Sequence, residues 1–259
     1  MKKLLPLLVL LGCCVAWAQT PPRNATVFAN LDQNNNWGSC TGSCAGGSTA
    51  YPTTYWAPFQ TTPSRDGSSL KFYVDGPAWT DVLFWNKVGP HDNSTHFQFD
   101  FWMQLDSNST TIGQAIEMDA FQFAKGTEYM FGTQCDYASG AWEIWSQGMG
   151  MWISTGVTCQ KFTPNVWYHI TWNFHRNNYS WDKSTYYDNV TIERYDTSNN
   201  LAARNTYTFG YGYPSGPMPA TWSDDLGVQF QVDLNGQAGI NGNPSTITQF
   251  VDQVKLTAW

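Results

Sequence analysis

Short runs in which apolar and polar residues alternate recur along most of this chain. The runs 97–105, 166–174 and 228–234 each place an apolar residue at every second position. Because successive side chains of a β-strand point to opposite faces, these runs predict strands with one face in a core. Segment 189–209 holds two such runs around a turn-forming stretch and predicts a hairpin. No segment has the period of a long amphipathic helix, so we expect an all-β fold.

The chain shows no internal repeat and no linker long enough to divide it. Residues 30–69 are rich in Asn, Gly, Ser, Thr and Pro, which predicts long loops with a strand or two. A length of 259 residues is compatible with one large β-sandwich. We therefore expect a single β-sandwich domain over residues 19–259, preceded by a signal peptide over residues 1–18.

The first residues have the pattern of an export signal. Two lysines at 2–3 precede the apolar run 4–15, and the Ala-Trp-Ala sequence of residues 16–18 fits a cleavage site. We expect cleavage after this site and a secreted protein. As an alternative, the Leu-Leu-Gly-Cys sequence of residues 10–13 resembles a bacterial lipobox, which would anchor the chain through a lipid on Cys13. Neither this run nor any later segment is long and apolar enough to span a membrane.

Charge and composition exclude several classes of partner. The chain has 13 basic and 20 acidic residues; loss of the two lysines of the signal leaves 13 − 2 = 11 basic residues and a net charge of −9. No basic patch is present, so a nucleic acid is not an expected partner. An acidic polysaccharide would be repelled by the overall field. The 16% of aromatic residues exclude a disordered chain and provide flat rings for a core or for sugar faces.

Four cysteines lie beyond the predicted signal: Cys40, Cys44, Cys135 and Cys159. An even number in an exported protein predicts two disulfides. Of the three possible pairings we favour Cys40 with Cys44, which closes a small loop, and Cys135 with Cys159, which clips two segments together. A zinc site is the alternative, although no histidine lies near Cys40.

The polar faces of the predicted strands carry Gln, Asp, Glu, His, Asn and Trp, with almost no Lys. Polar groups of these types orient a hydroxyl-rich ligand, and Trp offers a flat apolar platform. This composition favours a ligand groove over an ordinary solvated sheet face. The expected ligand-binding residues are Trp102, Gln122, Trp145, His169, Asn173, Gln229 and Gln231.

The segment 115–123, Ala-Ile-Glu-Met-Asp-Ala-Phe-Gln-Phe, places Glu117 and Asp119 on one face of a strand, about 7 Å apart. It resembles the active-site strand of laminarinase/lichenase-type glucanases, which reads Glu-x-Asp-x-Glu or, with a bulge, Glu-x-Asp-x-x-Glu. The resemblance implies a concanavalin A-like jelly-roll β-sandwich of two antiparallel sheets. It also implies that Glu117 is the nucleophile and that Asp119 supports it.

The glutamine at 122 stands where the bulged glucanase pattern has its acid/base. An amide cannot donate a proton to a leaving oxygen, and retaining hydrolysis needs two carboxyls about 5–5.5 Å apart. Glu143 on a neighbouring strand is the first candidate for the missing acid. We also expect a bulge after Asp119, which would return Gln122 to the face of Glu117.

The C-terminal segment 249–256 resembles the last strand of the same superfamily, where an Asp often helps to hold a structural calcium. The resemblance implies that Asp252 is a calcium ligand. No cofactor is required for the expected function.

Three functional hypotheses follow from these features. The leading one is a secreted carbohydrate-binding protein that recognises a neutral polysaccharide, such as a β-glucan, in the concave groove. The second is a glycoside hydrolase with Glu117 as nucleophile and an acid from another strand. The third is a non-catalytic envelope or matrix protein whose ligand is another protein.

Overall fold

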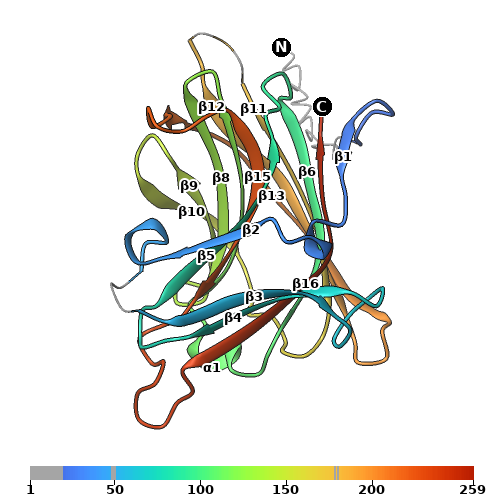
Figure 1. Ribbon diagram of the computed structural model, residues 1–259, viewed down its shortest axis with the longest axis vertical. Coiled ribbons are helices and arrows are strands. Elements are labelled where there is room, and N and C mark those ends of the chain that lie inside the picture. The colour runs from blue at the N-terminus through green and yellow to red at the C-terminus, as the bar shows by residue number, and fades with distance from the viewer. Residues whose placement is uncertain (1–19, 48–50, 178, 180) are drawn as a thin grey trace, which may run out of the picture.

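The computed structural model describes residues 20–47, 51–177, 179 and 181–259, so the predicted signal peptide lies outside the described residues. The chain folds into two antiparallel sheets that lie face to face (Figure 1). The helical segments are short: η1 (Leu31–Gln33), η2 (Gly42–Cys44) and α1 (Ser109–Ile112). The expected all-β class and the jelly-roll sandwich are both confirmed.

One sheet, called the back sheet below, consists of β1 (Thr26–Phe28), β3 (Thr53–Gln60), β4 (Ser69–Asp75), β6 (His96–Leu105), β11 (Tyr168–Arg176), β12 (Ser184–Tyr195), β13 (Leu201–Pro214) and β16 (Thr246–Ala258). Its strand order is β13-β12-β11-β6-β16-β4-β3, and β1 pairs with the end of β16. The hairpin predicted within 189–209 is confirmed, because β12 and β13 pair on either side of the turn.

The other sheet, called the groove sheet below, consists of β2 (Trp37–Thr41), β5 (Asp81–Gly89), β7 (Ala115–Ala124), β8 (Thr127–Asp136), β9 (Ala141–Ser146), β10 (Met151–Thr158), β14 (Gly216–Pro217) and β15 (Asp225–Asp233). Its strand order is β10-β9-β8-β7-β15-β5-β2, with β14 paired to β8. Strands from distant parts of the chain, such as β7 and β15, therefore lie side by side.

Aromatic side chains fill the space between the two sheets. The apolar positions of β6 are fully buried, as the alternation predicts. The ring of Phe101 on β6 meets that of Phe230 on β15 edge-on, with centroids 4.9 Å apart, and so joins the two sheets. Because each buried ring of this size stabilises the fold by about 1.5–3 kcal/mol, this layer is the main source of stability.

Both predicted disulfides are present, so the zinc alternative is wrong. Cys40 is bonded to Cys44 at the end of β2, and Cys135 of β8 is bonded to Cys159 after β10. The second bond ties the β9–β10 hairpin to β8 and closes a loop of 24 residues, which stabilises the fold by about 3 kcal/mol in the loop-entropy model. Such bonds are typical of an oxidising compartment. Within the described part of the chain, no helix has the length and apolarity needed to cross a membrane.

The bulge expected after Asp119 is wrong. Strand β7 pairs with β8 residue by residue from Ala115 to Ala124, and its pairing with β15 is equally regular. The period of two therefore continues, so that Phe121 takes the face of Glu117 and Gln122 turns into the interior between the sheets.

The buried amide of Gln122 is fully partnered in that interior. Its Nε2 donates to the carbonyls of His91 and Ser94 at 2.6 and 3.1 Å, and its Oε1 accepts from Nε of Arg176. These bonds remove the cost of an unpaired core amide, which was the physical reason to expect a bulge. Gln122 is thus a structural residue and does not bind a ligand in the groove.

Candidate functional site

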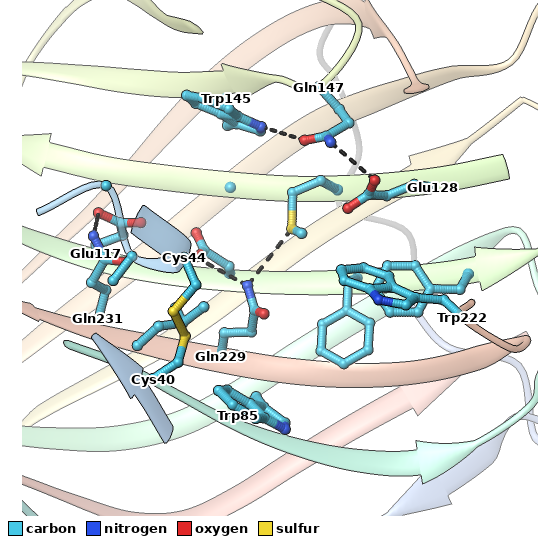
Figure 2. A pocket seen from close by; sticks show the side chains of 18 of the residues that line it. Cys40, Cys44, Trp85, Glu117, Glu128, Trp145, Gln147, Trp222, Gln229 and Gln231 are labelled. Carbon is cyan, nitrogen blue, oxygen red and sulfur yellow. Dashed lines mark hydrogen bonds between the residues drawn. A yellow bond between two sulfur atoms is a disulfide. The ribbon is translucent and has the colours of Figure 1, made fainter. Parts of the chain in front are cut away.

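A groove of about 750 Å³ lies on the outer face of the groove sheet. Figure 2 shows Glu117 and Gln231 at one end and Trp222 at the other, with Trp85 and Trp145 on opposite sides. One end of the groove therefore holds acids and amides, and the other holds aromatic rings together with Glu128.

One row of residues crosses the middle of the groove at right angles to the strands. Asp119 of β7 pairs with Gly132 of β8 on one side and with Gln229 of β15 on the other, and Gln229 pairs with Trp85 of β5. Trp145 on β9 lies directly beyond Gly132. A Cβ added to this glycine would be only 2.8 Å from the Cβ of Trp145. The row thus has an indole at each side and hydrogen-bonding groups between them.

The two indoles are held in place by different contacts. The ring of Trp85 packs directly on the backbone of Gly38. A Cβ added to Gly38 would come within 2.6 Å of this ring. The Nε1 of Trp145 donates to Gln147 Oε1 at 2.6 Å, and Gln147 Nε2 donates to Glu128 Oε2 at 3.0 Å. Because both rings are fixed before any ligand arrives, their ordering costs little entropy on binding.

Two amides and two acids form the polar centre. Gln231 Nε2 donates to Glu117 Oε2 at 3.1 Å, and Gln229 Nε2 donates to Asp119 Oδ2 at 3.4 Å. The other oxygen of Asp119 accepts from the backbone N–H of Thr133 at 3.2 Å. No donor from the described residues reaches the Oε1 atom of either glutamine, so both amide oxygens are available as acceptors in the groove.

Glu117 belongs to a chain of four buried carboxyls. Hydrogen bonds link Asp81 to Asp233, Asp233 to Glu117, and Glu117 to Asp119. Strands β5, β15 and β7 bring these groups together. The alternation of 228–234 already placed Asp233 on the face of Gln229 and Gln231, whereas Asp81 has no comparable signal in the sequence.

Burial raises the pKa of all four carboxyls. The pKa of Glu117 is held well above its usual value by burial, with the charges of Asp119 and Asp233 adding to the effect. Burial raises the pKa of Asp119 and of Asp81 to about 7. Burial and the charge of Asp81 raise the pKa of Asp233 well above its usual value. Protons are therefore shared along the chain near neutral pH.

Glu143 does not contact Glu117. In the register of β7, β8 and β9, Gln134 lies between them, and its Nε2 donates to Glu143 Oε2 at 2.7 Å. Two inter-strand steps separate the backbones of the two acids by about 10 Å. Glu143 is also absent from the lining of the groove.

Three expected ligand-binding residues lie on the opposite surface of the molecule. Trp102 on β6 and His169 and Asn173 on β11 belong to the back sheet. The rings of Trp102 and His169 stack at 4.7 Å, and Asn173 is buried with its amide donating to Asn189 at 3.0 Å. Alternation indicates only that a residue faces away from the core, and each sheet of a sandwich has such a face. The expectation that these three line the groove is therefore corrected.

Trp145, Gln229 and Gln231 do line the groove, together with Glu117 and Asp119. Sequence reasoning missed most of its aromatic lining: Trp85, Phe121, Phe123, Trp152 and Trp222. The period of two places Phe121 and Phe123 on the same face as Glu117. A regular strand over 115–124 would therefore have predicted both rings as groove residues, whereas the expected bulge assigned this face to Gln122.

Asp252 lies on β16, far from the groove, beside Asp32 of η1. Asp252 Oδ2 accepts from Ser64 Oγ at 2.9 Å and from the backbone N–H of Arg65, while Asp32 Oδ1 accepts from the N–H of Val254 at 2.7 Å. Asp252 Oδ1 and Asp32 Oδ2 are buried and have no partner. Burial raises the pKa of Asp32 to about 6, and the charge of Asp252 adds to the shift.

These two oxygens are of the kind that Ca²⁺ prefers, but calcium takes six to eight oxygen ligands. The described residues contain no group of three or more His, Cys, Asp or Glu side chains suited to a metal. A calcium ion at Asp252 and Asp32 would thus depend on backbone carbonyls or water for its remaining ligands.

No protein-family model matches the chain, and no curated protein matches it in sequence. Among solved structures, it is similar to arcelin-5, a lectin-like defence protein from Phaseolus vulgaris, with 7% identity, 87% of this chain and 99% of that chain covered, and a TM-score of 0.42. It is similar to the basic winged bean lectin, solved with Tn-antigen, with 8% identity, 82% and 99% coverage, and a TM-score of 0.46. It is also similar to the PL-14 alginate lyase from Aplysia kurodai, with 11% identity, 83% and 91% coverage, and a TM-score of 0.48.

Proposed function

We propose that this protein is a secreted carbohydrate-binding protein that holds a neutral polysaccharide, with a β-glucan as the first candidate, in the groove. The observation that carries the proposal is the row across the middle of the groove. It places an indole on each side of the Asp119 and Gln229 side chains. A sugar ring needs this combination, because it has apolar C–H faces and a rim of hydroxyl groups.

The dimensions of the row suit an extended oligosaccharide. Trp85 on β5 and Trp145 on β9 are separated by four inter-strand steps, or about 19 Å in a flat sheet. A chain of several sugar rings lying across the strands would stack on both indoles. Its hydroxyls would donate to the free amide oxygens of Gln229 and Gln231 and exchange hydrogen bonds with Asp119.

Secretion is part of the proposal. The N-terminal pattern of an export signal and the two disulfides both support it. Polysaccharides of cell walls and extracellular matrices are encountered outside the cell, where such a protein would meet its ligand.

The test is binding of purified protein to an array of neutral glycans, followed by titration with the best oligosaccharides. Trp85→Ala and Trp145→Ala should each weaken binding by about tenfold or more, because a central aromatic platform is lost. Trp102→Ala removes the same side chain from the back sheet and should leave affinity unchanged. Failure of a correctly folded sample to bind any neutral glycan would overturn the proposal.

Hydrolysis of the bound glycan is a second candidate function. Glu117 and Glu143 lie in one register row, two strands apart, with Gln134 between them. An inverting glycosidase needs its two carboxyls about 6.5–9.5 Å apart, which leaves room for a water between them. The carboxyls that hydrogen-bond to Glu117 are too close to flank a glycosidic bond from both sides. Release of reducing sugar from β-glucans by wild type, abolished by both Glu117→Gln and Glu143→Gln, would establish this function. Intact glucan after prolonged incubation would eliminate it.

A further inference from the structure

The groove extends beyond the row that crosses its middle. Phe121 and Phe123 follow Asp119 on the same face of β7, and Trp222 lies over Phe123 with the ring centroids 4.8 Å apart. These three rings all line the groove and are called the aromatic wing below. Figure 2 shows Trp222 at the end of the groove away from Glu117. The wing follows the strands and reaches about 13 Å from the row, the length of strand between Asp119 and Phe123.

The aromatic wing presents an exposed indole on top of buried rings. The ring of Phe121 packs on the backbone of Gly227, where an added Cβ would come within 2.4 Å of the ring. Phe121 and Phe123 stack on each other at 4.8 Å and are only 2% and 5% exposed, whereas Trp222 is 47% exposed. Trp222 is therefore the surface of the wing that a ligand in the groove would meet.

The segment that carries Trp222 is fixed to the turn between β7 and β8. The N–H of Met218 donates to the carbonyl of Gly126 at 3.1 Å, before the indole. After it, Asp224 Oδ1 accepts from the N–H of Lys125 at 3.1 Å. Contacts on both sides of Trp222 hold this segment against the groove sheet, so that ordering it for a ligand costs little entropy.

Polar side chains flank the aromatic wing on both sides. Glu128 lies opposite Phe123 on β8, and its Oε2 accepts from Gln147 Nε2 at 3.0 Å. On the other side, Lys87 forms an ion pair with Asp225 at 3.1 Å, and its Nζ lies 6.0 Å from the centroid of the Phe123 ring. An aromatic platform between hydrogen-bonding groups is also what the row provides, and it suits a further sugar ring.

The opposite flank of the row is bordered by the Cys40–Cys44 disulfide. Cys40 on β2 pairs with Leu83 on β5, which lies in register with Gln231 and Glu117. The disulfide lines the groove on this flank, and Glu117 is only 5% exposed there. A substituent on a sugar held in the row therefore finds an open platform on the side of the aromatic wing.

We propose that the groove recognises a branched glycan, whose backbone lies on the row from Trp85 to Trp145 and whose sugar side chain stacks on Trp222. This inference rests on the proposed function, because it assigns the form of the polysaccharide bound in the same groove. The row crosses the strands and the aromatic wing follows them, so the two platforms meet at right angles. A branch point has this shape, and a straight chain does not. A sugar ring on Trp222 would also remove exposed apolar surface from water.

The experiment compares three oligosaccharides on wild-type protein by titration calorimetry. They are a linear β-glucan hexasaccharide, the linear heptasaccharide, and a branched heptasaccharide made of the hexasaccharide with a single glucose on a central sugar. The branched heptasaccharide should bind about tenfold more tightly than the linear one of equal size, because only the branch reaches the additional aromatic platform. Equal or weaker affinity for the branched heptasaccharide would overturn the inference.

Variants locate the preference on the aromatic wing. Trp222→Ala should lower the affinity for the branched heptasaccharide about tenfold more than the affinity for the linear one. Trp181→Ala is the matched control, because its indole is 80% exposed and lies outside the lining of the groove, and it should keep the preference. Equal losses for the linear and the branched heptasaccharide in Trp222→Ala would show that the backbone itself lies on this indole, against the inference.

Trp222→Tyr supplies an independent arm, since it keeps an aromatic ring on the wing. It should keep most of the preference, and a loss as large as in Trp222→Ala would contradict stacking of the branch. Failure of this inference is distinguishable from failure of the proposed function. Linear oligosaccharides that bind as tightly as the branched one overturn only the inference. Absence of binding to all three also overturns it, and absence of binding to every neutral glycan overturns the proposed function as well.

Discussion

At the scale of single residues, Glu117 and Gln122 show how neighbours decide the role of a polar side chain. Both are almost completely buried. Glu117 faces the groove among other carboxyls, and Gln122 faces the interior among carbonyls and a guanidinium. The glucanase-like pattern places them in one active site, but the regular ladder of β7 puts them on opposite faces.

Gln122 should therefore matter for stability and not for chemistry. Gln122→Leu removes the acceptor of Arg176 Nε and the donor to the Ser94 carbonyl, while the His91 carbonyl keeps only the N–H of Ser94. We expect the variant to lower the free energy of unfolding by about 2–4 kcal/mol. Gln122→Glu should create no hydrolysis of β-glucans, because the new carboxyl points away from the groove. Urea denaturation and a reducing-sugar assay measure the two effects. An undiminished midpoint for Gln122→Leu would show that the interior bonds contribute little.

The prediction of a structural calcium ion depends on Asp252. If the ion bound there and at Asp32, added Ca²⁺ would raise the melting temperature of wild type and a chelator would reverse the shift, since a ligand that binds only the folded state stabilises it. Asp252→Asn should lose this response while it keeps its bond to Ser64. Identical melting curves with calcium and with chelator would show that wild type holds no calcium.

At the scale of elements, the outer face of the back sheet is crossed by a ladder of alternating charges. Lys255 pairs with Asp100 at 3.2 Å, Asp100 and Glu193 flank His169 at 3.3 and 3.0 Å, and Arg204 lies 3.5 Å from Glu193. The ladder joins β16, β6, β11, β12 and β13, and the alternation of sign lets each charge stabilise both neighbours.

The ladder should make stability depend on the protonation of His169. Burial acts to lower the pKa of His169, but hydrogen bonds and charges from Asp100 and Glu193 outweigh it, so the folded pKa is raised. A raised histidine pKa stabilises the fold below the unfolded pKa, about 6.5, and this contribution is lost as pH rises through the folded pKa. Unfolding measured between about pH 6 and 9 should show the decline, and His169→Gln should reduce its slope. The same slope in both proteins would exclude a role for the ladder.

At the scale of the whole molecule, the sandwich has two outer faces of different chemistry. The outer face of the back sheet has paired charges and stacked rings. The outer face of the groove sheet has the groove, with its buried acids and fixed indoles. Strands from three distant parts of the chain contribute the acids, which makes the carboxyl chain a property of the complete fold.

The carboxyl chain should make the protein more stable in mild acid than in weak base. Asp81 and Asp119 have a folded pKa of about 7, above the unfolded values. The folded state therefore binds more protons than the unfolded state between about pH 4 and pH 7, and stability falls as pH rises through this window. The melting temperature should be higher at about pH 5 than at about pH 8.

Asp233→Asn tests the origin of this slope, since it removes the carboxyl that links Asp81 to Glu117. The melting temperature of the variant should depend less on pH than that of wild type. At about pH 8 the variant should be more stable than wild type. His169→Gln acts on the back sheet, so the two changes should add if the sites are independent. A steeper decline in Asp233→Asn would contradict the assignment.

The sequence by itself determined the strands, the core faces and the disulfides. Alternation is a local property, because each residue of a strand reverses the direction of its side chain regardless of what pairs with it. The positions of β6, β11 and β15 and the buried side of each could therefore be read from the chain. The pairing of Cys40 with Cys44 and of Cys135 with Cys159 was predicted from their spacing and confirmed.

Only the tertiary structure decided which polar face belongs to which surface. Trp102 and Trp145 occupy equivalent positions in alternating runs, yet strand order puts them on opposite sides of the sandwich. Asp81 reaches Asp233 because β5 pairs with β15 across 152 positions of sequence. Such pairings are chosen by how the sheets bury their apolar faces together, a global condition that no local pattern encodes.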